Sequence, residues 1–170
     1  MSMQKIIIAI IVTIAIIAGI AVIIYRKCGQ NLINFSEIAE NDNWDELSLT
    51  IYYLSPGTLT LFPIGAELLA DAWHEQRIVV YGNDLREHAD LLLQLDTVKL
   101  IPVAEESRIN ARIYYVFETK GGRAFRVAMW GAGQSLFVNG REVEEHSLLY
   151  DVLIPFLPEG IFLDIEHLIR

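Results

Sequence analysis

Hydrophobic residues are distributed very differently in the first segment of the chain and in the rest. Residues 6–25 form a twenty-residue stretch that contains no charged side chain. A helix rises about 1.5 Å per residue, so this stretch spans roughly 30 Å, the thickness of the hydrocarbon core of a bilayer. An isolated segment in lipid satisfies its backbone hydrogen bonds only as a helix. The pattern therefore predicts a transmembrane helix over residues 6–25.

The residues at the end of this stretch are typical of a membrane–water interface. An aromatic side chain is favoured at the level of the lipid headgroups, and basic side chains are favoured just outside the span. The expected anchor residues are Ile6, Ile17, Tyr25, Arg26 and Lys27. We expect the bilayer to be one partner of the chain, through residues 6–25.

A cleaved signal peptide is the alternative interpretation of the same stretch. A small-x-small site occurs at Gly19-Ile20-Ala21, but cleavage there would leave an apolar tail on the mature chain, so an uncleaved anchor is favoured. Basic residues lie on both sides of the span, which leaves its orientation open. The short tail at residues 1–5 favours a signal anchor with an extracytoplasmic domain. The oligomeric state is open.

The remaining chain is expected to form a polar juxtamembrane linker at residues 26–46 and one globular domain at residues 47–170. Within the linker, Ile33, Phe35 and Ile38 are expected to pack against the domain. From Leu47 onward the apolar period changes to two, which predicts a half-buried strand over residues 47–54. The turn residues 55–57 and the segment 58–62 then predict a returning strand with Leu59 and Leu61 facing inward.

The middle of the chain alternates between helical and strand patterns. Residues 65–76 are expected to form a helix whose apolar side includes Leu68, Leu69, Ala72 and Trp73, and residues 77–82 a buried strand. A second helix is expected over residues 84–95, capped by Asn83 or Asp84, with an apolar stripe of Leu85, Ala89, Leu92 and Leu93. Residues 98–103 then predict a strand, and Pro102 places it at a sheet edge.

The longest strand signal runs over residues 109–130 and contains a testable turn. A three-residue loop at Lys120–Gly122 pairs Phe117 with Phe125, Tyr115 with Val127, and Ile113 with Met129, which keeps apolar residues on one face. A loop of two or four residues would mix charged and apolar residues, so we predict the three-residue loop.

A second hairpin is predicted around Asn139-Gly140, a dipeptide typical of two-residue hairpin turns. Residues 147–157 then predict a helix that begins at Ser147, and residues 161–170 fit either a helix or a strand. Hairpins with a few helices between and after them predict an α+β fold: one transmembrane helix followed by a small domain of mainly antiparallel hairpins with two or three packing helices.

Charge narrows the range of partners. The chain has 13 Lys and Arg residues and 22 Asp and Glu residues, and three of the basic residues flank the predicted membrane helix. Residues 29–170 therefore carry a formal charge of −12, because the remaining ten basic residues face all 22 acidic ones. This disfavours nucleic acid and anionic lipid as partners of the domain, since both are bound through neutralised phosphates.

No catalytic, cofactor-binding or metal-binding motif is found in the sequence. The four histidines are dispersed, and neither HExxH nor paired cysteines occur. Asp71 with His74 and Asp84 with His88 have helical spacing, but solvated helix faces commonly carry such pairs. We therefore expect no catalytic residue, no metal and no cofactor.

The candidate binding residues lie on the outer face of the central hairpin. Arg112, Tyr114, Arg126 and Trp130 gather basic and aromatic side chains in an otherwise acidic domain, and such residues often anchor protein interfaces. The alternatives are that the terminal helix covers this face, or that these residues form cross-strand pairs and bind no partner.

These patterns favour a single-pass membrane-anchored, non-enzymatic interaction or sensing module, with a protein partner at the outer hairpin face. Two other classes stay open. One is a membrane-tethered hydrolase that uses His74 or His88 with nearby carboxylates. The other is a small-ligand receptor, with a pocket lined by Tyr52, Tyr53, Tyr114 and Tyr115.

Overall fold

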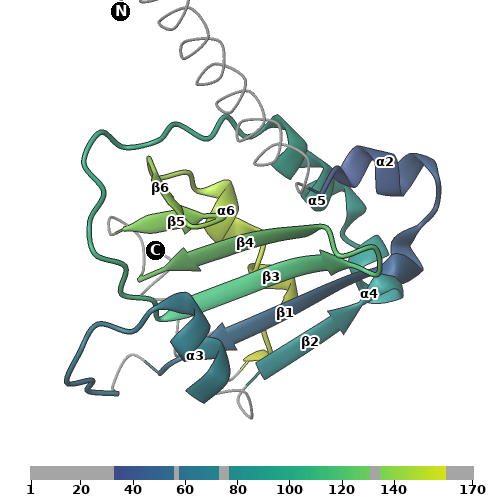
Figure 1. Ribbon diagram of the computed structural model, residues 1–170. Coiled ribbons are helices and arrows are strands. Elements are labelled where there is room, and N and C mark those ends of the chain that lie inside the picture. The colour runs from purple at the N-terminus through teal and green to yellow at the C-terminus, as the bar shows by residue number, and fades with distance from the viewer. Residues whose placement is uncertain (1–32, 56–57, 73–76, 131–134, 160–170) are drawn as a thin grey trace, which may run out of the picture. The chain divides into compact units, whose positions relative to one another are not determined.

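A six-stranded antiparallel sheet with the strand order β2-β1-β3-β4-β5-β6 organises the chain (Figure 1). The structure is a computed structural model, which describes residues 33–55, 58–72, 77–130 and 135–159. The strands are β1 (Leu47–Tyr53), β2 (Arg77–Tyr81), β3 (Ile113–Thr119), β4 (Ala124–Met129), β5 (Leu136–Val138) and β6 (Arg141–Val143).

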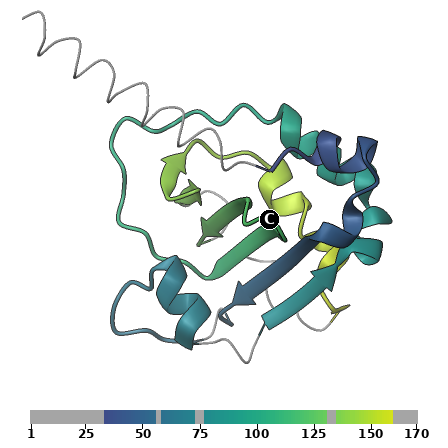
Figure 2. The same ribbon diagram turned by 45° about the vertical axis from the view of Figure 1, so that its right-hand side comes forward.

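Short helices accompany the sheet, which confirms the predicted α+β class. They are α2 (Phe35–Glu40), α3 (Ala66–Ala72), α4 (Gly82–Arg86), α5 (Ala89–Gln94) and α6 (Leu148–Asp151), with 3₁₀ helices at Trp44–Glu46, Leu95–Thr97 and Ile154–Phe156. The helices are more numerous and shorter than the two or three that the sequence predicts. Figures 1 and 2 agree that α3 lies at one end of the sheet and that α2, α4 and α5 lie at the other.

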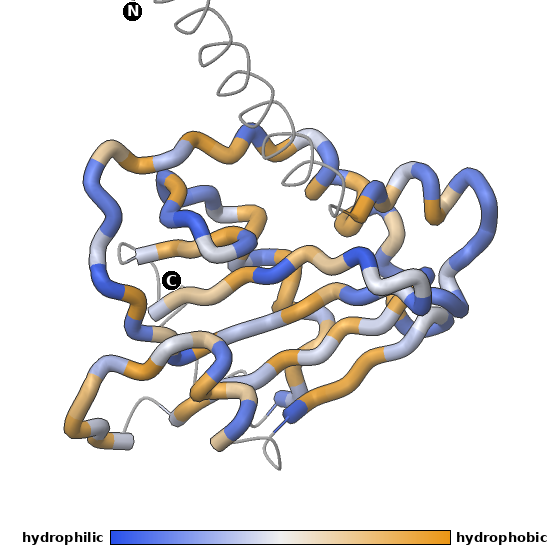
Figure 3. Tube along the Cα trace, in the orientation of Figure 1, coloured by the Kyte–Doolittle hydropathy of each residue, from blue (hydrophilic) through white to orange (hydrophobic). Residues whose placement is uncertain are grey.

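The main core lies on one face of the sheet and follows the predicted alternation. Leu47, Leu49 and Ile51 of β1 are buried, whereas the residues between them are half-buried. Side chains of α2, α4, α5 and α6 complete this core, among them Phe35 and Leu92. The tube coloured by hydropathy shows the apolar positions that recur along the strands (Figure 3). Burial of these side chains is the main stabilising term of the fold.

The predicted register of the central hairpin and the predicted turn of the β5–β6 hairpin are both confirmed. Strands β3 and β4 pair Phe117 with Phe125, Tyr115 with Val127, and Ile113 with Met129. Gly122 has φ 79°, the left-handed conformation that a three-residue loop requires. In the β5–β6 turn Asn139 has φ 50° and Gly140 has φ 81°, as expected for a type I′ turn.

The predicted first hairpin is wrong. Residues 58–62 do not form a strand, and Leu59 and Leu61, expected inside, are 97% and 94% exposed. Strand β1 instead pairs with β2 along one edge and with β3 along the other. Both edges of β1 are therefore occupied, and the 58–62 segment has no backbone partner there.

The prediction for residues 65–103 is correct in order but wrong in detail. In α3 the buried residues are Ala66 and Leu69, while Leu68 is 54% exposed, and Trp73 lies outside the described residues. The expected single helix over residues 84–95 is divided into α4 and α5, and α4 begins at Gly82 without a side-chain cap.

The strands expected on either side of residues 84–95 also differ from the prediction. Strand β2 is an edge strand, so only Val80 in it is buried. Residues 98–103 form no regular strand. They join the sheet edge through a single bridge between Pro102 and Val143, flanked by hydrogen bonds from the Val103 N–H to the Glu142 carbonyl (3.2 Å) and from the Glu144 N–H to the Ile101 carbonyl (2.8 Å). Pro102 lacks the N–H that a regular ladder needs, which limits this pairing.

The end of the chain matches its prediction in part. The helix expected from Ser147 is α6 followed by the 3₁₀ turn Ile154–Phe156, and Ser147 is the N-cap of α6. Residues 161–170 lie outside the described residues.

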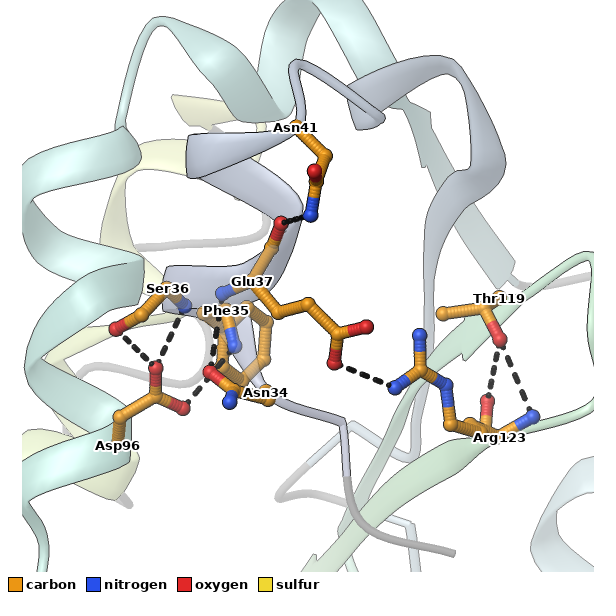
Figure 4. A network of polar contacts seen from close by, with 8 residues as sticks. All are labelled: Asn34, Phe35, Ser36, Glu37, Asn41, Asp96, Thr119 and Arg123. Atoms are coloured by element: carbon orange, nitrogen blue, oxygen red, sulfur yellow. Dashed lines mark hydrogen bonds and ion pairs between the residues drawn. The ribbon is translucent and has the colours of Figure 1, made fainter.

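The end of the expected polar linker belongs to the folded domain. Ile33, Phe35 and Ile38 are buried in the main core, as predicted, and Phe35–Glu40 is helical. The carboxylate of Asp96 accepts hydrogen bonds from the Phe35 N–H (3.1 Å), the Ser36 N–H (2.7 Å) and the Ser36 hydroxyl (2.7 Å), as Figure 4 shows. Asp96 therefore fixes the beginning of α2 to the rest of the domain.

The predicted membrane helix at residues 6–25 lies outside the described residues. In the part of the chain that is described, no helix is long and apolar enough to cross a membrane.

Candidate functional site

In the described part of the chain, fewer helices pack on the second face of the sheet than on the first. A smaller core here joins α3 to the sheet, and its buried members are Leu54, Ile64, Ala66, Leu69, Ala111, Tyr114, Ala128 and Phe137. Helices α2, α4, α5 and α6 contribute instead to the main core on the other face. Among the described helices, α3 is therefore the one that packs on this second face.

The four candidate binding residues share this face, but two of them are not accessible. Arg112 is 6% exposed and Tyr114 is 8% exposed, whereas Arg126 is exposed and Trp130 is half-buried. The sequence placed all four on an outer surface, and this is wrong for Arg112 and Tyr114, because α3 and the segments beside it cover them. The 160–170 segment, in which the sequence expected a cover, lies outside the described residues.

Arg112 holds the segment that follows β1 against the sheet. Its guanidinium lies 4.5 Å from the centre of the Trp130 ring, and its Nη1 donates a hydrogen bond to the Thr58 carbonyl (2.9 Å). Within the described residues its Nε has no hydrogen-bond partner, and burial lowers the pKa of Arg112. A buried guanidinium that is stacked and hydrogen-bonded in this way is a structural contact between distant parts of the chain.

A pocket of about 300 Å³ opens beside Tyr114. Its lining residues come from α3, the 107–109 segment, β3, β4, β5 and the β5–β6 turn: Ala66, Glu67, Ser107, Ile109, Tyr114, Arg126, Ala128, Phe137 and Gly140. The buried side chains of Ala128 and Phe137 make its floor apolar, and the exposed side chains of Glu67 and Arg126 add one charge of each sign. A concave apolar surface with a few polar groups is typical of a small-molecule site.

Both charged residues of the pocket affect the pKa of Tyr114. Burial raises the pKa of Tyr114, and the negative charge of Glu67 adds to this rise, whereas Arg126 opposes it through its positive charge and a hydrogen bond. Both charged side chains therefore lie within electrostatic reach of one hydroxyl group. The ring of Tyr52 stacks on that of Tyr114, with 5.8 Å between their centres, and this stacking restricts the Tyr114 side chain.

A polar cluster borders the pocket at Ser107. The carboxylate of Glu142, which is 7% exposed, accepts hydrogen bonds from the Ser107 N–H and from the Ser107 hydroxyl (2.9 Å). The Ser107 hydroxyl also contacts that of Ser135. Because the Ser107 N–H and hydroxyl both bind Glu142, this cluster fixes the irregular 104–111 segment to β6, on which Glu142 lies.

Among the described residues, the three most exposed large apolar side chains lie in one connection of the fold. Leu59 is 97% exposed, Leu61 is 94% exposed and Phe62 is 77% exposed, and all three belong to the segment between β1 and α3. We call Leu59, Leu61 and Phe62 the apolar segment. Exposed groups of large apolar residues mark interaction sites in soluble domains.

The histidines proposed for a hydrolase are not brought together in the described residues. Asp84 and His88 lie on opposite sides of the break between α4 and α5, and the His88 ring packs edge-on against Phe156, with 5.1 Å between ring centres. The Nδ1 of His146 accepts a hydrogen bond from the Leu148 N–H (3.3 Å). His74 lies outside the described residues, and within them no group of His, Cys, Asp and Glu residues is arranged to hold a metal ion.

The tyrosines proposed for a ligand pocket have separate roles. Tyr114 lines the pocket, but Tyr115 points into the main core, where its hydroxyl donates a hydrogen bond to the Leu149 carbonyl (2.9 Å) and burial raises its pKa well above the ordinary value. Neighbouring residues of a strand point to opposite faces, so these two tyrosines cannot line the same cavity.

Most residues that line the pocket were not predicted from the sequence. Glu67 lies in α3, Ser107 and Ile109 lie in the connection before β3, and Phe137 lies in β5, so no local pattern connects them. The sequence also does not predict that Leu59 and Leu61 are exposed, because the alternation of apolar and polar residues around them resembles that of a strand. Comparison of the chain with protein-family models, curated proteins and solved structures finds no match.

Proposed function

We propose that this chain is a single-pass membrane-anchored, non-enzymatic interaction module, and that its domain binds a protein partner through the apolar segment. The observation that carries this proposal is the nearly complete exposure of Leu59, Leu61 and Phe62 in one connection of the fold. Burying one such side chain contributes about 1.5–3 kcal/mol, so the three together provide roughly 5–9 kcal/mol before the cost of association.

The charge of the domain favours a protein over a lipid surface as the partner of this segment. The formal charge of −12 on residues 29–170 repels anionic lipid headgroups. The same charge favours a partner whose contact surface is apolar with a basic rim.

The fixed position of the apolar segment supports the same role. The Arg112 hydrogen bond to the Thr58 carbonyl and the bond from the Ile64 N–H to the Asn110 side chain (3.0 Å) hold both ends of the segment against the sheet. A surface that is held in place before binding loses less conformational entropy when it binds.

The test is site-specific photocrosslinking in the native membrane. A photoreactive phenylalanine analogue at position 61 should form an adduct with one protein, and Leu59→Ser combined with Phe62→Ser should abolish it. The matched control places the analogue at Tyr81, an exposed apolar residue on β2. Adducts with lipid alone, equal adducts from both positions, or an adduct that survives the two serine substitutions would overturn the proposal.

The proposed membrane anchor and orientation need a separate test. We propose that residues 6–25 span the bilayer and that the domain is extracytoplasmic. Gly121 is exposed in the β3–β4 loop, and a Cβ there would meet its nearest atom at 3.7 Å, so Gly121→Cys should leave the fold unchanged. With Cys28→Ser in the same chain, an impermeant maleimide should label intact cells. Labelling only after lysis would place the domain on the cytoplasmic side.

The hydrolase alternative has less support. It requires His74 or His88 to converge with a carboxylate on substrate. His74 lies outside the described residues, and the His88 ring packs edge-on against Phe156.

A further inference from the structure

The pocket beside Tyr114 has a separate set of features from the apolar segment, and they define a ligand. Its volume of about 300 Å³ lies at the lower end of the range for small-molecule sites, so it suits a compact ligand such as an amino acid. The floor formed by Ala128, Phe137 and Ile109 is apolar, so part of the ligand is expected to be hydrocarbon.

The charged groups of the pocket constrain the rest of the ligand. Arg126 is a cation with several N–H donors, and Glu67 is an anion that accepts hydrogen bonds. In the described part of the chain neither side chain takes part in an ion pair. Both side chains line the same pocket of about 300 Å³, so one small ligand in it can contact both charges.

A ligand with a single charge fits this arrangement less well. A simple carboxylate would bind Arg126 but would be repelled by Glu67 and by the acidic domain, whereas a simple amine would bind Glu67 and be repelled by Arg126. A ligand that carries both charges satisfies both side chains.

We infer that the pocket binds a free α-amino acid with an aliphatic side chain. The Arg126 guanidinium receives the carboxylate, the Glu67 carboxylate receives the ammonium group, and the aliphatic side chain packs against Ala128 and Phe137. The Tyr114 hydroxyl, which Arg126 orients, lies beside the carboxylate position. This inference goes beyond the proposed protein interaction, and it stands even if the apolar segment binds no partner.

The test uses the full-length chain in detergent micelles and isothermal titration calorimetry with L-leucine. Two analogues separate the contributions of the charges: 4-methylpentanoate lacks the ammonium group, and isoamylamine lacks the carboxylate. L-leucine should bind, and each analogue should bind at least about tenfold more weakly, because a hydrogen bond to a charged group is lost and the opposing charge is left unmatched.

The variants assign the binding to the pocket. Arg126→Gln and Glu67→Gln change exposed side chains, so both should fold, and each should weaken L-leucine binding at least about tenfold. The matched controls are Arg86→Gln on α4 and Glu87→Gln beside it, which are also exposed and lie at the other end of the sheet (Figure 1); both should bind L-leucine like the original chain. Ala128→Leu fills the floor of the pocket and should abolish binding.

Three outcomes would overturn the inference. The first is the absence of binding at millimolar L-leucine, and the second is equal binding of L-leucine and 4-methylpentanoate, which would identify a carboxylate site. The third is equal weakening by Arg86→Gln and Arg126→Gln, which would show that the effect comes from the overall charge. Photocrosslinking at position 61 reports separately on the protein interaction, so failure of one proposal is distinguishable from failure of the other.

Discussion

Gly82 lies at the closest backbone approach between two elements of the domain. It begins α4 directly after β2 and passes against the 3₁₀ helix Trp44–Glu46. A Cβ at this position would lie 2.4 Å from the Trp44 carbonyl oxygen and 2.8 Å from the Asp45 Cα. Ordinary contacts begin near 3.4 Å, so the two segments must separate by about 1 Å in Gly82→Ala.

The destabilisation follows from which atoms collide. All of the nearest atoms belong to backbone, so no side-chain rotation relieves the contact. Trp44 is buried in the main core, and a shift of its backbone disturbs the packing around it. Overpacking of this kind costs about 1–3 kcal/mol, and alanine returns at most about 1 kcal/mol through its higher helix propensity. Because the collision is with backbone, the cost lies at the upper end of this range, and after the gain from alanine we expect Gly82→Ala to lower the free energy of unfolding by about 2 kcal/mol.

Urea denaturation followed by circular dichroism measures this change. The matched control is Gly65→Ala, where the nearest atom to a Cβ is a Glu67 carboxylate oxygen at 4.0 Å. This control should lie within about 1 kcal/mol of the original chain, and a stabilising effect is allowed because alanine restricts the unfolded state. If Gly82→Ala and Gly65→Ala have the same midpoint, the close approach of α4 to the Trp44 backbone is refuted.

Three other changes test contacts at a distance from Gly82. Arg112→Met should release the segment between β1 and α3, and we expect chymotrypsin to cleave it several-fold faster than in the original chain; an unchanged rate would contradict the role of Arg112. Asp96→Asn should lower the free energy of unfolding by about 1–2 kcal/mol because α2 loses charged hydrogen bonds at its beginning, whereas Asp84→Asn on an exposed part of α4 should change it little in the same urea titration. Burial raises the pKa of Tyr150 from 10.0 to about 12. The neutral hydroxyl therefore stabilises the fold fully below pH 10, and this contribution to the free energy of unfolding is lost as the pH rises from 10 to 12, at up to about 1.4 kcal/mol per pH unit. Urea midpoints measured across that range should fall less steeply in Tyr150→Phe, and parallel curves for the two chains would contradict this prediction.

The two proposals concern neighbouring parts of the domain. Glu67 of the pocket and the exposed Leu68 are consecutive residues of α3, and the apolar segment leads into this helix. The apolar segment and the pocket are therefore close together in the sequence around α3, although they share no residue.

Local patterns in the sequence determine the central part of the sheet. The period-two alternation in 47–53, 113–119 and 124–129 assigns each residue to a face, and Gly122 and Asn139-Gly140 select the loop lengths. Turn conformation and strand alternation depend on residues within a few positions of one another, so both can be predicted from the chain alone. The anchoring of Ile33, Phe35 and Ile38 in the core also follows from their hydrophobicity.

The tertiary structure decided which elements are neighbours, and this changes the functional interpretation. Strand β1 takes β2 and β3 as partners, so the alternating 58–62 segment is left exposed although its local pattern resembles that of a strand. Helix α3 covers the face that carries Arg112 and Tyr114, and the same covering forms the walls of the pocket. Burial depends on what packs against a residue from distant parts of the chain, and for this reason the faces of the strands were determined by sequence while their accessibility was determined by the fold.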